Sequence, residues 1–264
     1  MKYRKTLLGA ISALALSATA IGSAQAAAPM GFAGTLGAAY NNTSCSGCGS
    51  TDTWSVDGSA AFGFNPTFGG EIDGTYNNAS SLDIWGVGGS LFWAPAMGRA
   101  GATFMFNTTS NSGVSADAYS YGAFGEYYAS PNITVGLKGG GTTLSGSGFS
   151  QTGGYVGAAL IGYVIPNLAF TPFVDYTGIS GLHVTNFGIS AEWLVSQTIP
   201  VAIFGGYTRS HVSFSGLGSG DTNTFTIGLR IYTNGNGNTL VERHRNGTLG
   251  WAGSAGGTSL LQAF

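Results

Sequence analysis

Two cysteines and three histidines are the first residues of this chain to consider as chemical groups. Cys45 and Cys48 form the motif CSGC, with two residues between them. A structural zinc site needs four ligands, and no neighbouring His or Cys completes one here. A redox motif of this spacing is typical of a βαβ context, which the sequence lacks. We therefore expect a local disulfide between Cys45 and Cys48, and neither a metal site nor a cofactor.

A histidine and a serine two residues apart, His211 and Ser213, have the residue types of a hydrolytic site. A serine nucleophile needs a histidine within hydrogen-bond reach and a third group that orients this histidine. Asp221 is near in the sequence, but it is not an obvious third member. His183 is expected at the rim, at the start of a strand. We expect no enzymatic activity and keep catalysis as the alternative interpretation.

The charged residues follow a regular pattern, which is clearest in DTWSVDGSAAFGFNPTFGGEIDGTYNN (52–78). Bulky or apolar residues alternate there with small, polar or charged ones, and the chain turns at Asn65-Pro66. Strict alternation predicts β-strands with two different faces. The same reasoning puts nine charged residues on the face opposite the bulky ones: Asp57, Glu71, Asp73, Arg99, Glu126, Lys138, Asp175, Glu192 and Arg230.

This alternation recurs along the chain and predicts about twelve strands, with ten or eight as alternatives. One predicted strand has Tyr155, Ala159, Ile161 and Tyr163 on its bulky face. Another has Pro172 inside it, which indicates a bulge, because proline cannot donate to a strand ladder.

The breaks between the predicted strands are of two alternating kinds. Five are short and contain a proline, namely Pro66, Pro95, Pro131, Pro166 and Pro200. The others are longer stretches rich in Gly, Ser, Asn and Thr, such as NNTSCSGCGST and HVSFSGLGSGDT. We expect short turns at one end of the strands and longer loops at the other.

The composition indicates that the bulky face meets lipid rather than water. Only 8% of the residues are charged, against about 25% in a typical soluble domain. Trp and Tyr gather near the ends of the predicted strands, as at a membrane interface. No stretch after residue 26 is apolar for the roughly 18 residues that a membrane helix needs. Since only a closed sheet satisfies its backbone in lipid, residues 27–232 are predicted to form an all-β, transmembrane, antiparallel up-and-down barrel.

The first 26 residues have the features of a cleaved secretory signal peptide. A basic start, MKYRK, precedes an apolar run and the small-residue site Ala24-Gln25-Ala26. Without them the chain has six basic and eleven acidic side chains. This is not the basic profile of a nucleic-acid-binding protein.

With its signal peptide, its glycine-rich alternating strands and TNTFTIGLRIYT near the end, the chain resembles the small porin-like outer-membrane proteins of Gram-negative bacteria. In that family the last strand carries a glycine followed by alternating apolar residues, which the barrel-assembly machinery recognises. Gly228, Leu229, Ile231 and Tyr232 match this assembly signal loosely. The resemblance implies insertion into the outer membrane, among phospholipid and lipopolysaccharide. The chain departs from the family by continuing to residue 264.

Two functions are compatible with this fold. Six acids against three bases in the barrel interior, or lumen, favour either a salt-bridge network that fills it or a narrow path for small cations. Glu126 and Lys138, on adjacent strands, are expected to pair. The leading interpretation is therefore a passive, porin-like, weakly cation-favouring channel or a structural surface protein. The alternative is a barrel enzyme acting on lipid A or peptides at the outer rim.

The pair His211-x-Ser213 resembles that of the outer-membrane lipid A deacylases, although Phe214 stands where that family commonly has Asn. This resemblance implies hydrolysis of lipid A for the alternative.

The tail, residues 233–264, has one charged cluster, Glu242-Arg243-His244-Arg245. It is expected at the periplasmic mouth, either as a disordered extension or folded back into the acidic lumen as a plug.

Overall fold

The computed structural model describes residues 31–45, 49–79, 82–111, 114–146, 148–196, 200–216, 218–233 and 237–249. The predicted signal peptide lies outside these residues.

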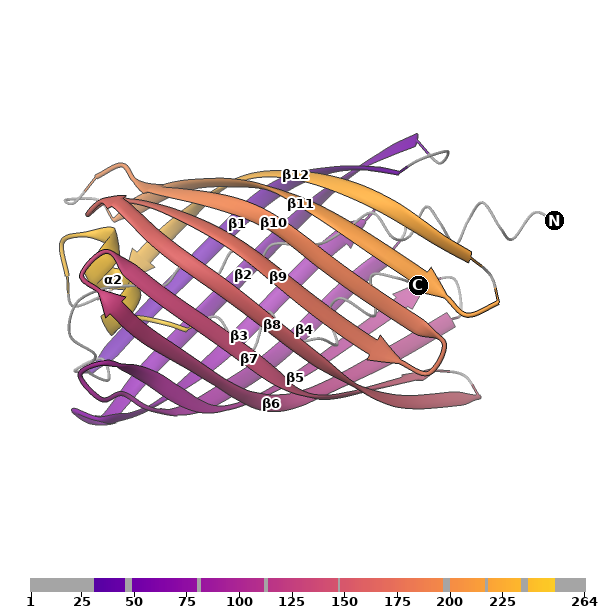
Figure 1. Ribbon diagram of the computed structural model, residues 1–264, viewed down its shortest axis with the longest axis horizontal. Coiled ribbons are helices and arrows are strands. Elements are labelled where there is room, and N and C mark those ends of the chain that lie inside the picture. The colour runs from indigo at the N-terminus through magenta and orange to yellow at the C-terminus, as the bar shows by residue number, and fades with distance from the viewer. Residues whose placement is uncertain are drawn as a thin grey trace.

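Twelve antiparallel strands close into a barrel, which confirms the predicted fold class (Figure 1). Each strand pairs with its sequence neighbours, and β1 pairs with β12, with Leu36 opposite Ile231. The strands are β1 (Phe32–Cys45), β2 (Gly49–Asn65), β3 (Phe68–Ala79), β4 (Leu82–Trp93), β5 (Gly98–Asn111), β6 (Val114–Ser130), β7 (Ile133–Gly146), β8 (Phe149–Ile165), β9 (Leu168–Ile179), β10 (Leu182–Leu194), β11 (Val201–Phe214) and β12 (Gly218–Thr233).

The five proline-containing breaks lie at one end of the barrel, which we call the proline-turn end. In the first of them the Asn65 side chain accepts hydrogen bonds from the backbone N–H of Thr67 and Phe68, both at 2.9 Å. Such an Asx turn lets the chain reverse within two residues. The expected bulge at Pro172 is wrong, since the β8–β9 register is the same on both sides of it. The β8–β9 register shifts instead between Tyr163 and Ile165, just before the turn.

The opposite end, here called the glycine-turn end, differs from the expectation of longer loops. Most of the polar stretches continue the strands, and the connections span only residues 46–48, 80–81, 112–113, 147–148, 180–181 and 215–217. Backbone pairing does not require apolar side chains, and glycines with positive φ, such as Gly181 (φ 79°), permit the tight turns. Strands of 12 to 17 residues exceed the roughly 9–11 needed to cross a bilayer.

The outer surface of the barrel is an apolar belt. Side chains such as Ile72, Val87 and Leu91 are more than half exposed. Aromatic rings pair across neighbouring strands toward the glycine-turn end: Tyr40 with Trp54, Tyr76 with Trp85, Phe106 with Tyr119 and Tyr207 with Phe225. Such a girdle is typical of barrels in a membrane. Among the described residues, no helix is long and apolar enough to cross a bilayer.

The orientation predicted for β8 is wrong. Tyr155, Ile161 and Tyr163 are at most 6% exposed and face the lumen. Val156 and Leu160, 58% and 47% exposed, face outward instead. Both faces of this strand are apolar, so bulk alone does not distinguish them.

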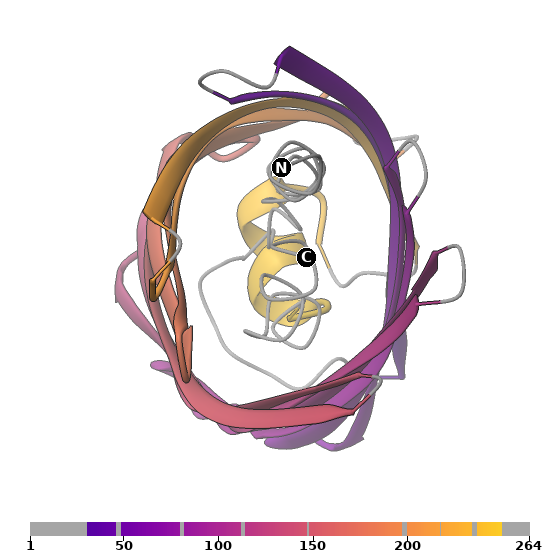
Figure 2. The same cartoon turned by 90° about the vertical axis from the view of Figure 1, so that its right-hand side faces the viewer.

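The short helix α2 (Leu240–Asn246) lies inside the barrel at the proline-turn end (Figures 1 and 2). It begins with a capping box, in which Thr239 accepts from the Glu242 N–H while the Glu242 side chain accepts from the Thr239 N–H. Residues 237–249 therefore fold back into the barrel, and we call this segment the plug.

Candidate functional site

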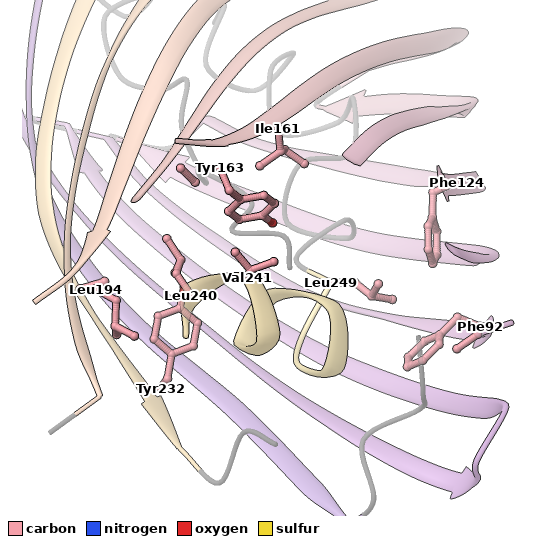
Figure 3. Close-up of a cluster of buried hydrophobic side chains, with 12 residues drawn as sticks. Phe92, Phe124, Ile161, Tyr163, Leu194, Tyr232, Leu240, Val241 and Leu249 are labelled. Atoms are coloured by element: carbon pink, nitrogen blue, oxygen red, sulfur yellow. The ribbon is translucent and has the colours of Figure 1, made fainter. Parts of the chain in front are cut away.

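The plug packs its apolar side chains against the lumenal wall. Leu240, Val241 and Leu249 are buried there against apolar residues from several strands (Figure 3). These wall residues are Phe92, Phe124, Ile161, Tyr163, Leu194 and Tyr232. The backbone N–H groups of Leu240 and Val241 donate to Asn167 Oδ1 (3.3 Å) and to the Pro166 carbonyl (3.1 Å). The β8–β9 turn therefore accepts hydrogen bonds from the first turn of the helix, because these N–H groups have no acceptor within the helix itself.

Arg99 joins the wall to the plug. Its Nε lies 2.9 Å from Glu126 Oε2, and neither side chain is exposed. Its two terminal nitrogens donate to the carbonyls of His244 and Gly247, both at 3.0 Å. One planar guanidinium thus binds two strands and the plug together.

His244 is the second polar contact between plug and wall. Its Nδ1 lies 3.2 Å from Tyr163 Oη, and its Nε2 lies 3.0 Å from Tyr232 Oη. Tyr232 donates in turn to Glu192, which Arg230 contacts at 3.0 Å. A continuous polar network therefore runs from β8 through the plug to β10 and β12.

Among the residues that the structure describes, the two arginines of the plug form no ion pair. Arg245 Nη2 donates to the Ser130 carbonyl at 2.8 Å, and its guanidinium lies over the Tyr128 ring at 4.4 Å. Arg243 lies over the Tyr232 ring, at 5.8 Å. Within the described residues, neither guanidinium has a carboxylate within 4.0 Å.

All nine charged residues singled out in the sequence occupy inward positions of their strands. The Glu126–Lys138 pair expected there is replaced by Arg99–Glu126 and by Lys138–Asp175, which are 2.9 Å apart. Arg230 also lies 3.6 Å from Asp57. Glu71 accepts from the Leu249 N–H of the plug. Asp73 accepts from Ser59 Oγ at 2.6 Å.

The residues of the expected assembly signal have two orientations. Leu229 and Ile231 face outward, 55% and 46% exposed. Tyr232 faces the lumen and belongs to the His244 network, a role that the sequence pattern did not indicate. Gly228 is also on the lumenal side, where an added Cβ would clash with the Phe204 ring.

Cys45 ends β1 and is not a free thiol. Cys48 lies outside the described residues, so the pairing stays a prediction.

The candidate hydrolytic residues lie on the outer face near the glycine-turn end. His211 Nδ1 lies 2.7 Å from Asp221 Oδ1, which supplies the third group that the sequence left open. Arg209 binds the other oxygen of Asp221 at 2.8 Å. The contacts of Asp221 with His211 and Arg209 are therefore also those of an exposed ion-pair cluster, which needs no catalytic role.

A closed barrel with an apolar belt outside, a polar lumen inside and an aromatic girdle is a transmembrane β-barrel. The comparison with NanC porin agrees with this class. NanC porin aligns with a TM-score of 0.54 at 8% identity, over 74% of this chain and 98% of NanC. KdgM porin in complex with disordered oligogalacturonate aligns at 0.46 and 11% identity, over 74% and 98%. OmpT, an outer-membrane protein of Vibrio cholerae, aligns at 0.44 and 10% identity, over 76% and 96%.

The chain therefore has the fold of outer-membrane porins. No protein-family model and no curated protein sequence matches it.

Proposed function

We propose that this protein is a narrow outer-membrane channel that weakly favours cations, and that the plug closes it at the proline-turn end. The observation that carries this proposal is which part of the chain occupies the lumen. The plug, a segment outside the barrel wall, lies within that end of the barrel (Figure 2), where charged wall residues such as Arg99, Glu126 and Arg230 are buried beside apolar ones. Twelve strands enclose more room than the eight at which side chains nearly fill a barrel.

The charge balance of the lumen supports a preference for cations. The wall carries six acids and three bases at the inward positions named above. The plug adds Arg243 and Arg245 against Glu242. Displacing the plug therefore increases the acidic surplus, and such a lumen attracts cations. The preference is weak because most of the acids already contact a base.

The contacts of the plug support reversible closure. A buried charge without a counter-ion costs free energy, and both plug arginines are in this situation among the described residues. Their contacts with carbonyls and aromatic rings offset only part of that cost. The plug is then bound strongly enough to close the lumen and weakly enough to leave.

The first experiment compares the full chain with a variant ending at Thr233, both refolded into planar bilayers. We expect the truncated barrel to conduct several times more current, because its proline-turn end is open. In a KCl gradient the sign of its reversal potential should show that K⁺ is more permeant than Cl⁻. A truncated barrel that is folded but conducts at no voltage would overturn the channel.

A reversible lock provides the matched control. Thr35 Oγ1 on β1 lies 3.3 Å from Thr248 Oγ1 of the plug, so cysteines at these two positions can form a disulfide. The variant T35C/T248C is made with Cys45 and Cys48 both changed to Ala, so that only the engineered bond is redox-active. We expect the oxidised form to stay closed at all voltages and the reduced form to regain the openings of the unlocked chain. Equal conductance in both forms would show that the plug does not control the path.

The contact between His211 and Asp221 favours hydrolysis of a lipid ester at the outer rim as a second candidate. Ser213 is two residues from His211 on the same outward face of β11. With Asp221 orienting Nδ1, the other nitrogen of His211 can accept the Ser213 proton, and Ser213 can then attack an ester carbonyl. The alcohol of the ester leaves with the proton held by His211, and water then hydrolyses the bond between the acyl group and Ser213 to release a fatty acid.

Mass spectrometry of lipopolysaccharide from cells that produce the wild type or Ser213→Ala tests this candidate. A hydrolase would remove an acyl chain in the wild type and leave it intact with the variant. Identical acylation in both would exclude the hydrolase and leave the channel proposal unaffected.

A further inference from the structure

Three buried oxygens on one stretch of the lumenal wall have no hydrogen-bond partner: Asp73 Oδ2, Thr75 Oγ1 and Ser90 Oγ. Asp73 and Thr75 are alternate residues of β3, so both side chains point into the barrel. Ser90 lies on β4 opposite Glu71, two residues from the partner of Asp73. Buried polar atoms are nearly always bonded to protein, water or an ion. Three unbonded oxygens in neighbouring positions therefore form a polar cluster whose hydrogen-bonding or coordinating capacity a bound cation would satisfy.

The chemistry of these atoms selects a cation. The other oxygen of Asp73 accepts from Ser59, a neutral group, at 2.6 Å, and the Asp73 carboxyl also has a side-chain hydrogen bond with Glu71 on the same strand. Among the ion pairs of the described residues, none includes Asp73, whereas Asp57, Asp175 and Glu192 each contact a base. Asp73 is also 3% exposed, so bulk water screens its charge little. A carboxylate with hydroxyl oxygens beside it is the ligand set of hard cations.

Glycines on the opposing strand let side chains of β3 and β5 meet at this position. Gly88 and Gly86 of β4 stand opposite Asp73 and Thr75, and neither has a side chain to fill the lumen. A Cβ added at Gly86 would clash with Thr75 Oγ1, and with Met105 Cε and Asn107 Oδ1 of β5. Oxygens from β3 and β5 thus come together above this glycine.

We propose that Ser59, Asp73, Thr75 and Ser90 form a cation site in the lumen, at which one partly hydrated alkali cation binds on its way through the barrel. The inference rests on the proposed channel function and gives it a location. The described residues contain no cluster of three or more metal-binding side chains. The site therefore holds a cation loosely, as conduction requires.

The test uses the full chain as parent, with its openings recorded under applied voltage, and K⁺ as the probe. Conductance is measured against KCl concentration, with the K⁺/Cl⁻ permeability ratio taken from the reversal potential. In Asp73→Asn the KCl concentration for half-saturation should rise by at least about fivefold, because one unit charge at about 4 Å has this effect in water and a larger one where water screens it little. The permeability ratio should fall in the same variant. Asp73→Glu keeps the charge and should stay close to the parent.

Asp175→Asn is the matched control, because it removes one lumenal carboxylate that is already paired with Lys138. We expect a clearly smaller shift of half-saturation than in Asp73→Asn. Ser90→Ala, which changes no charge, should weaken saturation modestly. Equal shifts for Asp73→Asn and Asp175→Asn would overturn the site and leave a channel governed only by its overall charge. A parent without any conductance would instead overturn the channel itself.

Discussion

Arg99 is the residue at which the barrel wall and the plug are joined most closely. It uses three nitrogens of its guanidinium for one carboxylate and two plug carbonyls. A lysine at this position has a single charged nitrogen and cannot repeat this planar geometry. The carbonyls belong to the end of α2 and to the residue that follows it, where a cation also complements the helix dipole.

Replacing Arg99 with Met should destabilise the barrel by about 3–5 kcal/mol, because it removes the guanidinium that Glu126 contacts while the carboxylate stays buried. The measurement is the unfolding free energy in detergent micelles. The double variant R99M/E126Q should recover part of the loss, because no charge is then left behind. If the single and double variants unfold at the same midpoint, the two side chains are not coupled.

At the residue scale, alternation in the sequence identifies which residues share a face, because side chains of a strand point alternately to either side. It does not identify partners. Glu126 contacts Arg99 rather than the expected Lys138, since pairing depends on the register and tilt of neighbouring strands. The contact of Tyr163 with His244 joins residues 81 positions apart. No local pattern indicates such a contact.

At the element scale, the number and the antiparallel order of the strands followed from the sequence, because alternation and proline breaks are local signals. The strand ends did not follow. Between β1 and β2 the ladder continues to Cys45 opposite Gly49, although the residues there read as a loop. Hydrogen bonding between backbones decides where a strand ends, and polar side chains do not interrupt it.

The helix α2 is an element for which the sequence did contain a signal. Thr239 and Glu242 have the spacing of a capping box, with the apolar pair Leu240 and Val241 between them. Hydrogen bonds from the backbone of Thr239 and Asn238 lower the pKa of Glu242, although burial opposes them. The cap therefore keeps its ionised carboxylate above the ordinary pKa of Glu and loses it only as the pH falls through the lowered value. The capping signal alone does not predict where the helix lies, because its position depends on the cavity that the barrel encloses.

At the scale of the whole molecule, the two halves of the lumen differ. The proline-turn half contains the plug with Arg99, Glu126, Glu192 and Arg230 around it. The glycine-turn half is lined mainly with uncharged side chains, which include the hydroxyl pair Thr43 and Thr224 at 2.8 Å and a buried apolar cluster with Ile84, Leu144 and Val212. A solute entering from the glycine-turn end thus meets uncharged polar and apolar groups first and the charged network afterwards. The proposed cation site lies between the two.

Because the apolar belt faces outward, we expect lysine substitutions at two depths on the outer face of β6 to destabilise the barrel to different extents. Ala123 lies in the apolar belt, between the outward rings of Tyr121 and Tyr127, whereas Ser115 lies on the same face near the glycine-turn end. Both are small and exposed, so neither substitution removes a packed side chain. In lipid vesicles Ala123→Lys should lower the unfolding free energy by about 2–4 kcal/mol and Ser115→Lys by about 1 kcal/mol or less, because the cost of a charge on the lipid face depends on depth. Urea titration followed by tryptophan fluorescence measures both. Equal and small losses of unfolding free energy would mean that water rather than hydrocarbon surrounds the belt. That result would contradict a membrane location for the proposed channel.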